Sequence, residues 1–173
     1  PIMGNTLLIG SCEPFSGKSA LVLGLARHLA AGGHPVRFGK PLATSLNWTP
    51  ADGALPDPLI DDDVRFVGST LGLAEDQLIP SLHLLSPLTA ESRLAQAELD
   101  AGEGFQRLRQ DLAQRGEGVT LLEAAGSLHE GLLYGLSLVQ LAHGLEAPVV
   151  LVHLWQDSRS VEALLAARDQ LGE

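Results

Sequence analysis

Apolar residues along this chain gather in short runs, and longer segments of mixed apolar and polar positions separate these runs. A short, continuous apolar run bounded by turn residues is typical of a strand that is buried on both faces of a sheet. Such runs predict strands at residues 6–10, 35–39, 119–123 and 147–154. The last run contains Pro-Val-Val-Leu-Val and has the strongest strand pattern of the four.

The segments between these runs predict helices at residues 18–31, 61–71, 94–115, 136–145 and 158–171. Gly32 and Gly33 are expected to end the first helix. Prolines and glycines predict a loop at residues 45–60 and irregular structure at residues 76–92. Because strands alternate with helices, the pattern predicts an α/β fold with a doubly wound, mostly parallel sheet between two helical layers.

The composition agrees with this picture and narrows the possible ligands. The chain has 173 residues, 45% hydrophobic and 18% charged, which suits one globular domain over residues 1–173. A formal net charge of −10 argues against general binding to nucleic acid or to anionic membranes, because both require a basic surface. The single cysteine, Cys12, excludes an internal disulfide, and no apolar stretch is long enough to span a membrane. We therefore expect a cytoplasmic protein.

The first candidate for chemistry is a phosphate-binding loop between the first expected strand and the first expected helix. Gly17-Lys18-Ser19 closes this segment, as in a Walker A motif. Backbone N–H groups and the helix N-terminus favour a phosphate there, Lys18 would reach the β- and γ-phosphates, and Ser19 would ligate Mg²⁺. Cys12 stands where the strict motif has glycine, which is a departure. The residues expected to bind the nucleotide, which we take to be ATP, are Glu13, Pro14, Phe15, Ser16, Gly17, Lys18, Ser19 and Ala20.

Two acidic positions are candidates for completing a Mg²⁺ site with Ser19. Glu123 ends an expected strand, where a doubly wound sheet presents residues to its ligand crevice; the alternative is a solvent-facing glutamate. In the run Asp61-Asp62-Asp63, each aspartate has the alternative of a solvated helix-cap residue. We choose Asp63 because it directly precedes the apolar residue at which the helix pattern starts.

Lys40 follows the second expected strand and would face a substrate carboxylate or the γ-phosphate, with an exposed surface lysine as the alternative. Thr44 and Ser45 lie on the same loop and add hydroxyl groups. The residues expected to act in catalysis are Lys18, Lys40 and Glu123.

These motifs together resemble dethiobiotin synthetase and its relatives, which include the cobyrinic acid amidating synthetases. The resemblance covers nearly the whole chain and rests on Gly17-Lys18-Ser19, Gly39-Lys40-Pro41, Asp63, Leu-Leu-Glu123-Ala-Ala-Gly126 and Ala147-Pro148-Val-Val-Leu-Val. The subgroup that it resembles most is the dethiobiotin-synthetase-like N-terminal domain of phosphotransacetylase-family proteins. That similarity rests on Glu13-Pro14-Phe15-Ser16-Gly17-Lys18-Ser19-Ala20, Asp62-Asp63-Val64-Arg65-Phe66 and residues 131–138.

The resemblance implies a P-loop domain that uses ATP and Mg²⁺ to phosphorylate a carboxylate or carbamate. It implies that Lys18 and Ser19 act as the P-loop lysine and hydroxyl, that Asp63 and Glu123 hold Mg²⁺, and that Lys40 faces the substrate and γ-phosphate. It also implies a homodimer, and a further strand and a regulatory domain after residue 173. Two departures are Ser11, where the family has glycine, and a small-residue turn after Glu123 that is poorer in glycine. Three functions remain open: an ATP-dependent ligase or synthetase or an ATPase, a regulatory nucleotide-binding module, and a degenerate scaffold.

Overall fold

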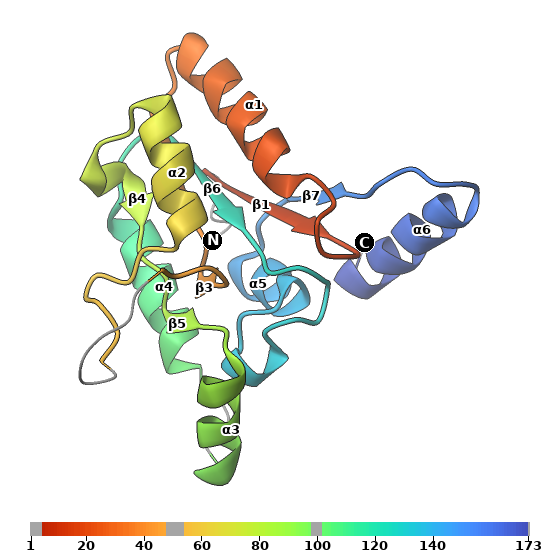
Figure 1. Ribbon diagram of the computed structural model, residues 1–173. Coiled ribbons are helices and arrows are strands. Elements are labelled where there is room, and N and C mark those ends of the chain that lie inside the picture. Colours follow the sequence, from red (N-terminus) through yellow and green to blue (C-terminus); the bar gives the residue numbers. More distant parts are fainter. Residues whose placement is uncertain (1–4, 48–53, 98–101, 173) are drawn as a thin grey trace.

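The computed structural model describes residues 5–47, 54–97 and 102–172. A parallel sheet of five strands, in the order β4-β2-β6-β1-β7, forms the centre of the molecule (Figure 1). The strands are β1 (Thr6–Ser11), β2 (Val36–Gly39), β4 (Leu78–Ile79), β6 (Val119–Glu123) and β7 (Val149–Val152). The predicted α/β fold with a mostly parallel sheet is confirmed.

Successive residues of each strand point to opposite faces of the sheet, and apolar residues lie on both faces. Helices cover both faces and bury these residues. On one face, Ile9 of β1 and Leu121 of β6 pack with α1 (Lys18–Ala31) and α2 (Asp62–Leu71). On the other face, their neighbours Leu8 and Leu122 pack with α4 (Glu103–Gln114) and α5 (Leu138–Leu145). The last helix, α6 (Arg159–Leu171), packs against α5.

The helices begin and end at residues whose side chains or backbones suit those positions. Asp61 precedes α2 in an extended conformation, and its carboxylate accepts a hydrogen bond from the backbone N–H of Asp63. Gly72 ends α2 in the left-handed conformation. At α5, Ser137 and Gln140 form a reciprocal capping box. These caps satisfy backbone groups that a helix end leaves without partners.

The structure corrects two of the expected segments. Residues 76–92 are not wholly irregular, because they contain the end of a one-turn 3₁₀ helix (Glu75–Gln77), β4, β5 (His83–Leu84) and most of α3 (Pro87–Ala95). The single helix expected at residues 94–115 is wrong, since α3 ends at Ala95 and α4 begins only at Glu103; residues 98–101 lie outside the described part. Proline lacks an N–H, but the first turn of a helix does not use that group, so Pro87 begins α3 after the Ser86 cap.

Smaller elements surround the carboxyl ends of the strands. β3 (Leu42–Ala43) pairs with β5 in a second parallel sheet, and a 3₁₀ turn, η2 (Leu132–Tyr134), precedes α5. Of the expected loop at residues 45–60, the described residues 45–47 and 54–60 form neither helix nor strand, and residues 48–53 lie outside the described part.

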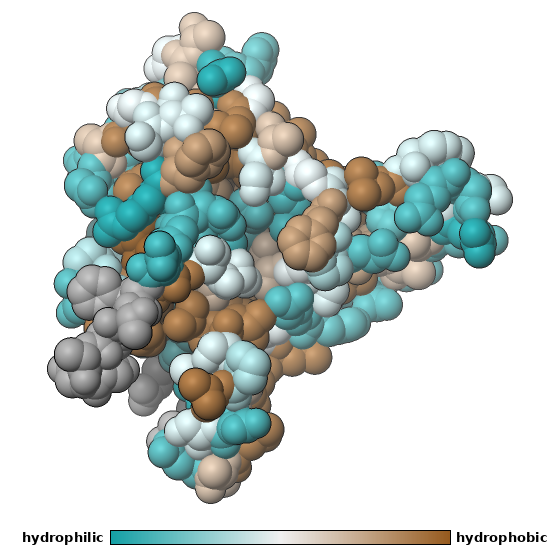
Figure 2. Space-filling model, viewed as in Figure 1, coloured by the Kyte–Doolittle hydropathy of each residue, from teal (hydrophilic) through white to brown (hydrophobic). Residues whose placement is uncertain are grey.

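Helix α3 projects from the body of the molecule and has no buried side chain (Figure 1). Thr89 hydrogen-bonds the Tyr134 hydroxyl at 2.9 Å and holds this helix to η2. Hydrophobic atoms gather on the surface just above α3 (Figure 2). Within the described residues, no helix is long and apolar enough to cross a membrane.

Candidate functional site

The loops that follow β1, β2 and β6 surround a cavity of about 790 Å³ at the carboxyl ends of these strands. In a doubly wound sheet this is the place where ligands bind, because the chain leaves neighbouring strands in opposite directions there. Here β1 leads through α1 to β2, whereas β6 leads through α5 to β7 on the other side. The cavity is lined by Pro14, Phe15, Ser16, Gly17, Lys18, Ser19, Lys40, Thr44, Ser45, Asp63, Glu123, Ala124, Ala125, Gly126 and Glu130.

The loop between β1 and α1 is shaped to present backbone N–H groups. Gly17 has φ 92° and precedes the first helical residue, Lys18. Phe15 also has a left-handed backbone, with φ 58°. The buried Ser16 hydroxyl donates to the Glu13 carbonyl at 2.8 Å and closes the turn. Left-handed residues beside a helix N-terminus make a concave backbone that favours an anion such as phosphate.

Lys18 is held at the floor of this loop. Its ammonium group donates to the Ser11 hydroxyl at 2.8 Å, and Ser11 in turn donates to the Gly126 carbonyl at 2.8 Å. Burial lowers the pKa of Lys18, and the Lys40 charge lowers it further, although Glu123 and Glu130 oppose these effects. Ser11 is completely buried, so this chain of hydrogen bonds connects the phosphate loop to the turn after β6.

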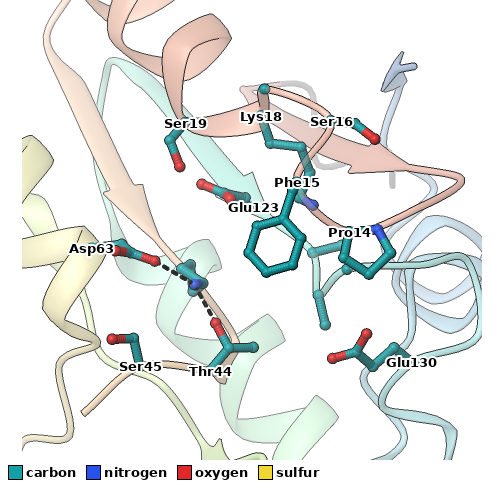
Figure 3. Close-up of a pocket in the computed structure, with 15 residues that line it drawn as sticks. Pro14, Phe15, Ser16, Lys18, Ser19, Thr44, Ser45, Asp63, Glu123 and Glu130 are labelled. Carbon is teal, nitrogen blue, oxygen red and sulfur yellow. Dashed lines mark hydrogen bonds and ion pairs between the residues drawn. The ribbon is translucent and has the colours of Figure 1, made fainter. Parts of the chain in front are cut away.

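Lys40 enters the cavity from the opposite side and is almost fully buried. Its ammonium group donates to the Thr44 hydroxyl at 2.6 Å and lies 3.2 Å from a carboxylate oxygen of Asp63 (Figure 3). It also lies 3.2 Å from a carboxylate oxygen of Asp61. Burial lowers the pKa of Lys40, but the Asp61, Glu123 and Asp63 carboxylates outweigh burial and raise it overall. Lys18 and Lys40 are the two lysines of the whole sequence, and both line this cavity.

The three consecutive aspartates have separate places. Asp61 is fully buried, caps α2 and accepts backbone hydrogen bonds from Thr44 and Ser45. Asp62 is half-buried and points away to accept the backbone N–H of Asn47. Asp63 is half-exposed and lines the cavity. The structure thus places Asp63 at the cavity and gives Asp61 a structural role.

Glu123 is the buried carboxylate at the end of β6. Burial raises its pKa, while Lys40 and Lys18 lower it less. Its Oε2 atom is buried and has no hydrogen-bond partner among the described residues. An unpartnered buried carboxylate oxygen is costly and suits a cation, so the site fits Mg²⁺.

A cation here would not be held by protein carboxylates alone. No group of three or more His, Cys, Asp or Glu side chains in the described ranges is arranged to hold a metal ion. Mg²⁺ in nucleotide sites normally takes one or two carboxylates together with phosphate oxygens and waters. Ser19, Asp63 and Glu123 on the cavity wall match that mode of binding (Figure 3).

The cavity brings together most of the residues that the sequence singles out. Lys18, Ser19, Lys40, Asp63 and Glu123 all line it, although they lie on separate segments. Two residues of the expected nucleotide-binding set, Glu13 and Ala20, are not among the lining residues and are exposed.

Ser11 and Glu130 have no predicted role in the site. For Asp61 the helix-cap alternative is the one that the structure shows, although the residue is buried and not solvated. Nothing in the sequence pattern marks Glu130, which reaches the cavity from the loop between β6 and η2.

The model of the AAA_26 family, described as an AAA domain, matches residues 5–172. No curated protein matches the sequence at a significant level.

Proposed function

The chain belongs to the AAA_26 family of P-loop NTPases, and from this premise we propose that it binds Mg-ATP in the cavity and transfers the γ-phosphoryl group to a carboxylate or carbamate. Nucleotide and Mg²⁺ binding are general properties of P-loop NTPases. The transfer reaction is the more specific part of the proposal, and it rests on the arrangement of charge around the site.

The main support for the proposal is that Lys18, Lys40 and Glu123, whose buried Oε2 atom has no hydrogen-bond partner, all line the same cavity. Lys18 and the N–H groups of the loop would bind the β- and γ-phosphates. Ser19, Asp63 and Glu123 would hold Mg²⁺, which neutralises charge on the phosphates when it is bound.

The position of Lys40 supports transfer of the γ-phosphoryl group to an acceptor, and not nucleotide binding alone. It enters the cavity from the loop after β2, across from the P-loop, and remains charged because its pKa is raised. A cation in this place would neutralise both the γ-phosphate and an approaching oxyanion, which lowers the repulsion between them. An oxygen of the acceptor would bond to the γ-phosphorus as the bond to the β,γ-bridging oxygen breaks. The products are a nucleoside diphosphate and an acyl or carbamoyl phosphate.

This reaction resembles that of dethiobiotin synthetase and the cobyrinic acid synthetases, and we propose that the chain is a relative of these enzymes. A regulatory nucleotide-binding module of a phosphotransacetylase-like protein is the alternative. Such a module would bind Mg-ATP without transferring its phosphoryl group, so binding and turnover must be measured separately.

The test of binding is the melting temperature of the purified protein with and without Mg-ATP. We expect Mg-ATP at 100 times its Kd to stabilise the fold by about 2.7 kcal/mol. Lys18→Met should abolish this effect, and Arg27→Met, which changes an exposed cation on the same helix, should leave it intact. If the parent protein shows no stabilisation, the proposal of a nucleotide site is wrong.

The test of transfer uses Mg-ATP with hydroxylamine, which traps acyl phosphates as hydroxamates, and a panel of carboxylic acids. Hydroxamate formation should require Lys40 and Glu123. If Mg-ATP binds but neither hydroxamate nor nucleoside diphosphate forms with any acid, the regulatory alternative replaces the transfer reaction.

A further inference from the structure

Glu130 is a carboxylate of the cavity wall that the proposed function does not use. Three carboxylates line the cavity, those of Asp63, Glu123 and Glu130. Asp63 pairs with Lys40, and Glu123 is the buried carboxylate that suits a cation. The side chain of Glu130 forms no hydrogen bond or ion pair with the residues that the structure describes. An unpaired negative charge therefore lies on the wall of a cavity proposed to bind phosphates.

The Glu130 carboxylate lies against the turn after β6, on the same side of the cavity as the first residues of the phosphate loop. A Cβ atom placed on Gly126 would be 2.8 Å from Oε2 of Glu130 and 3.0 Å from Cγ of Pro14. Figure 3 shows Glu130 and Pro14 together, across the cavity from Asp63 and Thr44. Because Gly126 has no side chain, the Glu130 carboxylate can approach the phosphate loop this closely.

The ammonium group of Lys18 lies near the same turn. It donates to the Ser11 hydroxyl at 2.8 Å, and Ser11 donates to the Gly126 carbonyl at 2.8 Å. The Glu130 charge raises the pKa of Lys18 against the larger, lowering effect of burial. Glu130 is not among the carboxylates that raise the pKa of Lys40. Its charge thus acts on the lysine of the phosphate loop, and not on the lysine across the cavity.

A nucleotide bound at Lys18 would bring its own negative charge to this side of the cavity. A P-loop lysine contacts the β- and γ-phosphates, while backbone N–H groups hold the α- and β-phosphates. Like charges repel strongly in a partly buried site, where water screens them less than in bulk solution. Pro14 has no backbone N–H group, so the loop offers no donor at that position to offset the repulsion.

We propose that Glu130 sets the affinity of the site for nucleotides, because its carboxylate competes with the terminal phosphates for the positive charge of Lys18. Binding of the β- and γ-phosphates has to overcome this repulsion or displace the carboxylate. The site consequently holds both ATP and the diphosphate product less tightly than the loop alone would. This inference rests on the proposed binding of nucleotide and adds the residue that limits its strength.

The experiment measures the Kd of a non-hydrolysable ATP analogue, of ADP and of AMP by isothermal titration calorimetry with Mg²⁺. Glu130→Gln removes the charge and should tighten binding of the ATP analogue about tenfold. ADP should gain less, and AMP should gain little, because AMP has no phosphate at Lys18. Glu130→Lys reverses the charge and should tighten binding further, whereas Glu130→Asp keeps the charge and should bind like the parent.

Glu117 provides a matched control. It is exposed and precedes the opposite end of β6, so Glu117→Gln removes the same charge from the chain without changing the cavity. This variant should leave all three Kd values unchanged. The circular dichroism of every variant without nucleotide should match that of the parent, because neither side chain belongs to the core.

The outcomes separate the inference from the proposed function. Unchanged binding of the ATP analogue in Glu130→Gln, or an equal gain for AMP, would overturn the inference and leave nucleotide binding intact. Weaker binding in Glu130→Gln would also overturn it, since the carboxylate would then assist binding of the Mg-nucleotide. If the analogue binds neither to the parent nor to any Glu130 variant, the proposed function fails together with the inference.

Discussion

Replacing each member of Asp61-Asp62-Asp63 by asparagine should give three different results, although the three residues are adjacent and chemically identical. Asp61 is the residue with the largest expected effect on stability. Its carboxylate accepts three backbone N–H groups, from Asp63 at 2.8 Å, Thr44 at 2.8 Å and Ser45 at 3.0 Å. It also lies 3.2 Å from the Lys40 ammonium group, and its side chain has no exposed area.

The size of the effect follows from these contacts. An asparagine has the same shape, but its NH₂ group would replace one acceptor oxygen and face donors. Breaking a buried ion pair by removing one partner costs about 3–5 kcal/mol, and we take this as the whole effect because the hydrogen bonds belong to the same carboxylate. For a domain of this size, Asp61→Asn should lower the melting temperature by about 6–20 °C.

The two neighbours are the controls. Asp62 accepts one exposed backbone hydrogen bond, so Asp62→Asn should change the free energy of unfolding by about 0.5 kcal/mol or less. Asp63 is half-exposed, so Asp63→Asn should have a similarly small effect without ligand. With Mg-ATP, however, Asp63→Asn should reduce the stabilisation and Asp62→Asn should not.

The assay is urea denaturation followed by circular dichroism, with and without Mg-ATP. An unchanged m-value would show that the variants unfold from the same native state. If Asp61→Asn and Asp62→Asn cost the same free energy, or if Asp61→Asn costs less than about 1 kcal/mol, the structural role assigned to Asp61 is wrong.

Three further predictions concern the cavity. Burial raises the pKa of Glu123 above its ordinary value of 4.5, so Glu123 stabilises the folded state when its carboxyl group is neutral. This stabilisation is lost as the pH rises from 4.5 through the raised pKa, because the buried group then becomes charged. Glu123→Gln should therefore stabilise the ligand-free protein at pH 7 while removing the Mg²⁺-dependent part of ATP binding. A destabilised variant in a pH series of melting curves would contradict this. Ser11→Ala removes the hydroxyl that accepts the Lys18 hydrogen bond and donates to the Gly126 carbonyl. It should lower the free energy of unfolding by about 1–3 kcal/mol and weaken ATP binding measured by calorimetry. Unchanged affinity for ATP would show that Ser11 does not position Lys18. An ATP analogue with an acyl phosphate should acylate the side chains of Lys18 or Lys40, and excess ATP should prevent it; mass spectrometry showing no protected lysine would place the nucleotide elsewhere.

The sequence predicts the parts of the fold that depend on local pattern. The run at residues 119–123 corresponds to β6 with the same bounds, and the helix at residues 18–31 corresponds to α1 with the same bounds. The sequence fails where local signals conflict, as at residues 76–115. There Pro87 begins a helix instead of breaking one, and the two-residue strands β4 and β5 are too short to produce a pattern.

The sequence indicated single residues of the candidate site, but it did not indicate how they are arranged around the cavity. Lys18 and Ser19 could be found because Gly-Lys-Ser has a known physical role between a strand and a helix. Phe15 was included only as part of that loop, because its exposure and its positive φ are properties of the folded structure. Glu130 had no signal, since its place in the cavity depends on how the turn after β6 is folded.

By itself, the sequence determined the class of fold and the chemistry of the phosphate loop, because strand and helix periods and the P-loop residues are local properties of the chain. Only the tertiary structure decided which of three aspartates is buried with Lys40, and that the two lysines share one cavity with Glu123. These residues are far apart in the sequence, and the parallel sheet brings them together because its strands all end at the same edge.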